Sequence, residues 1–188
     1  MSAWMAPLFF CGFFLLCLGG MPIGAGGQVH PYPDPTGGVT LRAGSGPAAT
    51  VMAGLVGTYP LGPQLRLRAE GLKAFQGIET CEAEFPDSQR CRSSPLMGVV
   101  GLSYQVPAGL WSFGLNAGAG VHFEDEAFGG AAPMLQLAGV LERALGDAWV
   151  GEATVFWAQA FNDTWEERIG ESLGYVLIGV GLRRRWHR

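Results

Sequence analysis

His122 is the side chain in this sequence best suited to acid–base chemistry, and Glu124 follows it two residues later. A histidine that acts as a general base needs a nucleophile within hydrogen-bond reach and a partner that orients its ring. No serine neighbours His122 in sequence, although Ser94 or Ser172 could approach it in space. We therefore interpret His122 as an ordinary rim residue, at the loop end of its strand, and predict no catalytic residue, with catalysis as an open alternative.

Cys81 and Cys91 flank a polar stretch, E-A-E-F-P-D-S-Q-R. In an exported chain the oxidising compartment favours a disulfide between two such cysteines. Metal binding is the competing interpretation, and it would need further His or Cys ligands close by, which this stretch lacks. The sequence thus predicts a disulfide in a loop, with no metal site and no cofactor.

Charged side chains also stand where they could pair inside a sheet. Arg66, Arg68 and Glu70 occupy alternate positions of an otherwise apolar segment and so share one face of a strand. A solvent-facing side of a soluble sheet is the alternative, but neighbouring segments lack a matching charged surface. We predict a polar interior that contains a charge network of Arg42, Arg66, Arg68, Glu70, Glu142, Glu152 and Arg183, with Gln136 beside it.

These side chains need strands to position them, and the clearest strand is Trp111–Phe123. Its odd positions are apolar, with aromatic residues at both ends, and its even positions are mostly glycine with Ser, Asn and His. A strand that crosses a bilayer places its bulky apolar face toward lipid and its small or polar face toward the lumen. The segment is also long enough, because a tilted strand crosses with about 9–11 residues.

The same alternation recurs in seven other segments, which gives eight strands in all. Turn-forming residues separate them, and short and long connections alternate as they do in barrels that cross a membrane. Aromatic residues form two belts at the strand ends. The predicted strands are 39–44, 49–59, 64–75, 97–106, 111–123, 134–143, 149–159 and 173–186. The belt beside the short turns contains Tyr59, Tyr104, Trp111, Trp149 and Trp186, and the belt beside the long loops contains Phe75, Phe123, Trp157 and Phe161.

The N-terminus and the composition indicate an exported, single-domain protein. Residues 1–27 read as a signal peptide, with an apolar core at 8–18 and small residues at 25–27. An uncleaved membrane anchor is the alternative, but the apolar run is short for a spanning helix. A proline-rich leader, 28–38, precedes a barrel domain at 39–188. The net charge of −4 gives no reason to expect a nucleic acid partner.

The layout of 39–186 resembles the small eight-stranded bacterial outer-membrane β-barrel proteins. The final segment, G-Y-V-L-I-G-V-G-L-R-R-R-W, resembles the C-terminal assembly signal of that family, although His187 and Arg188 follow Trp186 and Arg184 interrupts the apolar face. The resemblance implies an all-β fold, an eight-stranded antiparallel up-and-down transmembrane β-barrel in the outer membrane. It also implies contact with membrane lipid and with the barrel assembly machinery, and a monomer.

Function is less constrained than fold. We expect a structural or surface-interaction role, with an unidentified extracellular ligand at the loops 77–95, 124–130 and 161–171. An eight-stranded barrel is just wide enough for side chains to fill, so we predict a plugged, non-conducting lumen. Some outer-membrane barrels modify lipid A, but the H-F-E motif at His122 lacks the His-x-Ser arrangement of the lipid A deacylases. A secreted lipocalin-like barrel, with its apolar face inside and a small hydrophobic ligand, is the other alternative.

Overall fold

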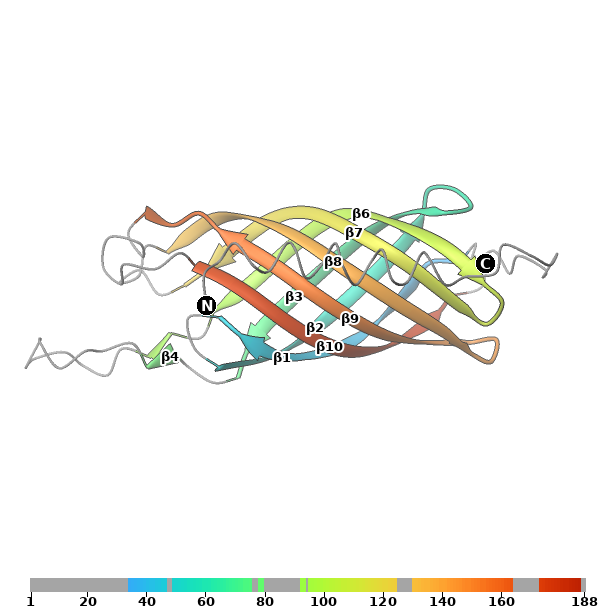
Figure 1. The fold of residues 1–188 in the computed structure, drawn as a ribbon, viewed down its shortest axis with the longest axis horizontal. Coiled ribbons are helices and arrows are strands. Elements are labelled where there is room, and N and C mark those ends of the chain that lie inside the picture. The colour runs from blue at the N-terminus through green and yellow to red at the C-terminus, as the bar shows by residue number, and fades with distance from the viewer. Residues whose placement is uncertain are drawn as a thin grey trace, which may run out of the picture.

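The structure is a closed, antiparallel, eight-stranded β-barrel. The computed structural model describes residues 34–46, 49–75, 78–79, 92–93, 95–124, 130–163 and 173–186. Around the wall the strands follow the order β1, β10, β9, β8, β7, β6, β3, β2, and β1 pairs with both β10 and β2 to close the ring (Figure 1). The predicted fold class is confirmed. The predicted signal peptide, 1–27, and the predicted disulfide between Cys81 and Cys91 lie outside the described residues.

The eight barrel strands match the predicted segments, and the largest differences are at two strand starts. β1 begins at Thr36, within the predicted leader, because its first residues pair with the end of β10. β8 begins at Ala131 because it continues the ladder to the end of β7. The barrel strands are β1 Thr36–Ser45, β2 Ala49–Pro60, β3 Leu65–Ala74, β6 Leu96–Ala108, β7 Trp111–Phe123, β8 Ala131–Leu145, β9 Trp149–Ala160 and β10 Leu173–Arg185.

A small second sheet lies within the predicted long loop between β3 and β6. It pairs β4, Ile78–Glu79, with β5, Arg92–Ser93, in antiparallel fashion. We call the end of the barrel near this sheet the loop end, and the opposite end, which holds the connections 61–64, 109–110 and 146–148, the turn end. β1 starts and β10 finishes at the turn end.

Two of the connections at the turn end need glycine for a conformational reason. Gly109 and Gly146 have φ of 65° and 77°, in the left-handed region that other L-residues rarely adopt. This left-handed conformation lets the chain reverse direction within two or three residues at each turn and return to the wall as the next strand. The short turns therefore keep β6 against β7 and β8 against β9.

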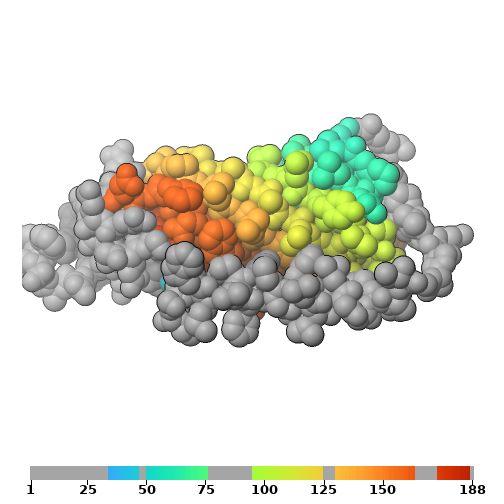
Figure 2. Space-filling model, turned by 45° about the horizontal axis from the view of Figure 1, so that its top comes forward, coloured from blue at the N-terminus to red at the C-terminus, as the bar shows by residue number. Residues whose placement is uncertain are grey.

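Side chains alternate between the inside and the outside of the wall along every strand. In β8, even-numbered residues from Ala132 to Glu142 are buried, whereas odd-numbered residues such as Leu135 and Leu137 are about half exposed. The space-filling view shows β2 to β9 following one another across the visible face in sheet order (Figure 2). No helix in the described part of the chain is long and apolar enough to cross a membrane.

Candidate functional site: the filled barrel interior

Seven charged side chains meet inside the half of the barrel nearer the turn end. The structure places all seven charges of the predicted network on the inner face, each with at most 6% of its surface exposed. They come from β1, β3, β8, β9 and β10, so closure of the barrel is what brings them together. They are Arg42, Arg66, Arg68, Glu70, Glu142, Glu152 and Arg183.

Arg68 lies at the centre of this network. Its two terminal nitrogens donate to the two carboxylate oxygens of Glu152, at 2.7 and 2.6 Å, in a bidentate pair. Its Nε also donates to Glu70. Bidentate guanidinium–carboxylate pairs are among the strongest hydrogen-bonded ion pairs in proteins. Arg68 therefore links a strand on one side of the barrel to one on the other, across the lumen.

The two ends of the network are held differently. Toward the middle of the barrel, Arg42 donates to Glu70 at 2.7 Å, and its guanidinium lies 4.5 Å from the ring centroid of Phe156. At the turn end, Arg183 pairs with Glu142 and lies 3.2 Å from Glu152. These contacts join the network to an aromatic ring at one end and to the carboxylates of Glu142 and Glu152 at the other.

Neutral polar side chains complete the network at the turn end. Arg183 donates to Thr36 and Thr58 at 2.8 and 3.2 Å, and Gln105 donates to Glu142 at 3.2 Å. Gln136, which we expected beside these charges, is buried, but neither of its amide atoms bonds any described residue. It lies on β8 closer to the loop end than Glu142 does, so the network does not extend to it.

These charges need close partners because they are buried. An isolated charge transferred out of water costs several kcal/mol, which only close, well-oriented opposite charges and hydrogen bonds offset. Four arginines face three glutamates here, so the described network carries one positive charge in excess. The Arg42 guanidinium contacts one carboxylate, that of Glu70, and stacks on the Phe156 ring.

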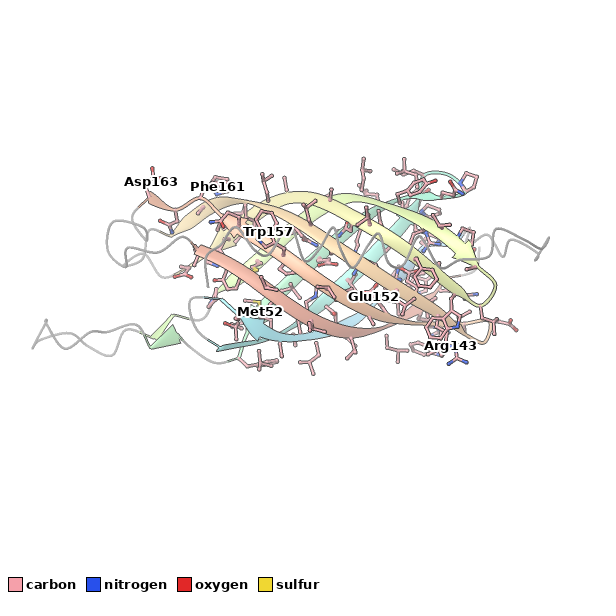
Figure 3. The ribbon with its side chains drawn as sticks, in the orientation of Figure 1. Met52, Arg143, Glu152, Trp157, Phe161 and Asp163 are labelled. Atoms are coloured by element: carbon pink, nitrogen blue, oxygen red, sulfur yellow. The ribbon has the colours of Figure 1, made fainter. Side chains whose placement is uncertain are left out.

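The other half of the interior, toward the loop end, is mainly apolar. Methionines from β2, β6 and β8 and side chains from β3, β9 and β10 form one cluster of buried residues. Figure 3 shows Met52 on this side and Glu152 closer to the turn end. The cluster contains Met52, Leu72, Ala74, Met97, Val99, Met134, Phe156, Ala158, Ala160, Leu173, Tyr175 and Leu177.

This apolar layer is the main feature that sequence reasoning missed. Its members occupy the inward positions of the alternation, the same positions that hold glycine or charge elsewhere on the strands. Tyr175 and Leu177, for example, precede Arg183 on the same face of β10. Inward-facing methionine, leucine and aromatic residues toward the loop end of several strands were the available signal.

His122 lies inside the barrel among the apolar cluster rather than on its rim. It is completely buried, and its Nε2 lies 2.9 Å from the Tyr175 hydroxyl and 3.6 Å from Glu124 Oε1. The structure describes no serine beside it, and the two candidate serines, Ser94 and Ser172, lie outside the described residues. Among the described residues, the geometry pairs His122 with the Tyr175 hydroxyl.

The nine predicted girdle residues all lie on the outer face, at the two ends of the barrel. In Figure 3, Trp157 and Phe161 are toward the loop end and Arg143, which lies over Trp111, is at the turn end. Between the belts the outer face is aliphatic on every strand. Exposed aliphatic residues include Val39, Leu55, Leu67, Val100, Leu102, Leu115, Leu137, Ile178 and Val180.

Within the described residues, no group of three or more His, Cys, Asp or Glu side chains is placed to hold a metal ion. The glutamates of the network pair with its arginines. Among the described residues, ion pairs occupy the half of the interior nearer the turn end, and the apolar cluster lies in the other half.

Comparison with known proteins agrees on the fold. No family model matches this sequence, and no curated protein matches it. Among solved structures, Neisserial surface protein A (NspA) is similar, with a TM-score of 0.57 and 11% identity over 81% of this chain and 96% of that chain. The attachment invasion locus protein Ail of Yersinia pestis gives a TM-score of 0.47 and 11% identity, over 81% and 97%. The chain thus belongs to the class of small eight-stranded β-barrels.

Proposed function

We propose that this chain is an outer-membrane β-barrel with a structural or surface-interaction role, whose lumen is closed to ions. One observation carries the proposal: the bulky apolar side chains face outward on all eight barrel strands, while charged and polar side chains are buried within. Water would disfavour such an exterior, since large contiguous apolar surfaces on soluble proteins are rare. A bilayer favours an apolar exterior. Closure of the barrel gives the backbone N–H and C=O groups of the wall hydrogen-bond partners on neighbouring strands.

The two belts of aromatic residues support the same placement. Tryptophan and tyrosine favour the membrane–water interfaces, and the aliphatic zone between the belts would span the hydrocarbon core. By analogy with bacterial barrels, the turn end would face the periplasm and the loop end the outside. Residues 1–27 would direct export, and the assembly machinery would recognise β10 as the last strand.

The alternatives receive less support. A lipocalin-like barrel keeps its apolar face inside, the reverse of the arrangement in this wall. A lipid-modifying enzyme needs an activated nucleophile, and His122 bonds Tyr175 instead. A surface-interaction role fits a rigid wall that carries its longer connections at one end, which is where recognition usually occurs.

Fractionation of cells that express the full chain tests the location. We expect recovery in the outer membrane, with a band whose gel mobility changes on boiling. Recovery as a soluble periplasmic or secreted protein would contradict the proposal.

The closed lumen has its own test in planar bilayers. Because ion pairs and apolar side chains fill successive parts of the interior, purified protein should give no steady conductance above that of the bare membrane. A stable, reproducible open level would show instead that the interior leaves an aqueous path.

A further inference from the structure

The two described arginines that face outward at the turn end lie on one wall of the barrel. Arg143 on β8 and Arg184 on β10 are both exposed, and β9 runs between them. The remaining outward-facing cation of the described barrel strands, Lys73 on β3, is at the loop end. At the turn end, the wall made by β2, β3 and β6 presents Tyr59, Leu65 and Tyr104 instead.

Tryptophans surround both arginines. Trp111 pairs with Arg143 across the β7–β8 ladder, and the Arg143 guanidinium lies 5.0 Å from the Trp111 ring centroid. Trp149 pairs with Arg184 across the β9–β10 ladder. Trp186 lies beyond Arg184, with its indole against Gly37 of β1. All three tryptophans are 40–56% exposed on the outer surface.

The strand between the two arginines carries no competing charge on its outward face. On β9 the outward residue that pairs with Arg143 is Gly151, which has no side chain. Leucines flank this glycine: Cδ1 of Leu145 lies 3.1 Å from where a Cβ of residue 151 would be, and Leu182 pairs with Gly151 across the β9–β10 ladder. Both arginines therefore border an uncharged, partly aromatic stretch of the wall at the level of the aromatic belt.

We propose that this wall, made of Arg143, Trp149, Gly151, Arg184 and Trp186, holds the phosphodiester headgroup of an anionic phospholipid in the leaflet on the turn-end side. The inference rests on the proposed membrane location. Guanidinium groups bind phosphate oxygens through paired N–H donors, and stacking on Trp111 holds the Arg143 fork in one orientation. The indoles place the site at the depth where headgroups lie.

Charge complementarity favours an anionic headgroup over a neutral one at this wall. Among described residues outside the lumen, the acidic side chains at the turn end are Asp34, which precedes β1, and Asp147, in the turn beyond Leu145. Neither is on the lipid-facing strands between the two arginines. The whole chain has a net charge of −4, so a cationic wall here is a local feature rather than a general property of the protein.

Quenching of tryptophan fluorescence by brominated lipids measures this contact. The full chain, with Trp4, Trp157 and Trp165 replaced by phenylalanine, keeps Trp111, Trp149 and Trp186 as reporters at the turn end. It is reconstituted in phosphatidylcholine vesicles that contain the same mole fraction of either brominated phosphatidylglycerol or brominated phosphatidylcholine. We expect the apparent affinity for the anionic lipid to be higher by about fivefold or more at low salt.

Matched variants distinguish binding at this site from general attraction between cationic side chains and anionic lipid. Arg143→Gln with Arg184→Gln removes both charges and should abolish the preference, whereas Lys73→Gln, which removes an outward cation at the loop end, should retain it. Equal quenching by the two lipids in the parent chain would overturn the proposal, as would a preference that survives in the double variant. Gel mobility of the same samples reports the barrel: a heat-modifiable band with equal quenching refutes the lipid site alone, whereas no heat shift and no quenching by either lipid refutes the membrane location as well.

Discussion

Arg68 shows how individual side chains determine the character of the lumen. It contacts Glu70 two residues away on its own strand and Glu152 on the far side of the barrel. Glu152 also lies 3.2 Å from Arg183, so one carboxylate compensates two buried guanidinium groups. Loss of a buried partner leaves an uncompensated charge, which is costly even where the intact pair adds little net stability.

Glu152→Gln should therefore destabilise the barrel strongly. The substitution keeps the shape of the side chain but removes the negative charge that Arg68 and Arg183 share, so we expect a loss of about 3–5 kcal/mol in unfolding free energy. Urea unfolding of the reconstituted protein measures it. Asp147→Asn, in an exposed turn, serves as the control and should change stability by less than about 0.5 kcal/mol.

Arginines outnumber glutamates in the described network. In the same urea assay, losing an arginine should therefore destabilise the barrel less than losing a glutamate. Arg42→Met removes the guanidinium that stacks on Phe156 and leaves Glu70 still paired with Arg68. It balances the described network, so it should cost clearly less than Glu152→Gln. Equal or greater loss for Arg42→Met would contradict our account of the charge balance.

At the scale of the strand, inward-facing glycines set how closely neighbouring strands and their side chains can approach. On β7, a Cβ at Gly120 would lie 1.9 Å from the carbonyl oxygen of Gly98 and 2.8 Å from Cα of Val99 on β6. On β6, Gly98 faces the outside of the wall, and a Cβ there would meet nothing within 4 Å. The two glycines lie on adjacent rungs of one ladder, on opposite faces of the wall, and differ in whether a side chain fits.

Gly120→Ala and Gly98→Ala form a matched pair for this constraint. Gly120→Ala forces β6 and β7 apart, and we expect a loss of about 1–3 kcal/mol in unfolding free energy, as for other overpacked sites. Gly98→Ala has room and should be neutral or slightly stabilising, because alanine restricts the unfolded chain more than glycine does. The urea midpoints of the two variants decide the matter, and similar midpoints would refute the steric argument.

At the scale of the whole molecule, the outer surface determines what solvent the barrel needs. Leu137 lies midway along β8, and Leu145 is the last residue of that strand, at the turn end. Both face outward and are about half exposed. In a bilayer these two positions differ in depth, whereas in water they would be equivalent.

Leu137→Arg and Leu145→Arg test the lipid-facing assignment. Arginine near the bilayer midplane costs a transmembrane barrel about 2–4 kcal/mol, falling to about 0–1 kcal/mol near an interface. We expect these respective losses when the two variants unfold reversibly in phospholipid vesicles. Equal effects at both positions would argue against a membrane-spanning wall.

The division of the interior into a charged half and an apolar half also has a consequence for the whole molecule. Replacing Met52, Met97, Met134 and Phe156 by alanine empties much of the apolar half but leaves the charge network intact. We expect this variant, if it keeps a heat-modifiable band, to remain non-conducting in planar bilayers. A steady conductance would show that the apolar half alone closes the barrel.

The sequence by itself determined where the strands run and which of their residues face inward. Alternation in β3, β7, β8, β9 and β10 identified which residues face inward and which outward, because successive side chains of a strand point to opposite sides. Turn-forming residues separated the segments, and the number of strands followed. The starts of β1 and β8 were missed because pairing with the adjacent strand extends them beyond the local pattern.

Only the tertiary structure decided which inward residues meet. Arg68 and Glu152 are 84 residues apart, and His122 and Tyr175 are 53 residues apart, so their contacts depend on closure and on the stagger of strands around the ring. A strand's alternation gives the face of a residue but not its height relative to strands across the lumen. That height sorted the inward side chains into a charged half and an apolar half.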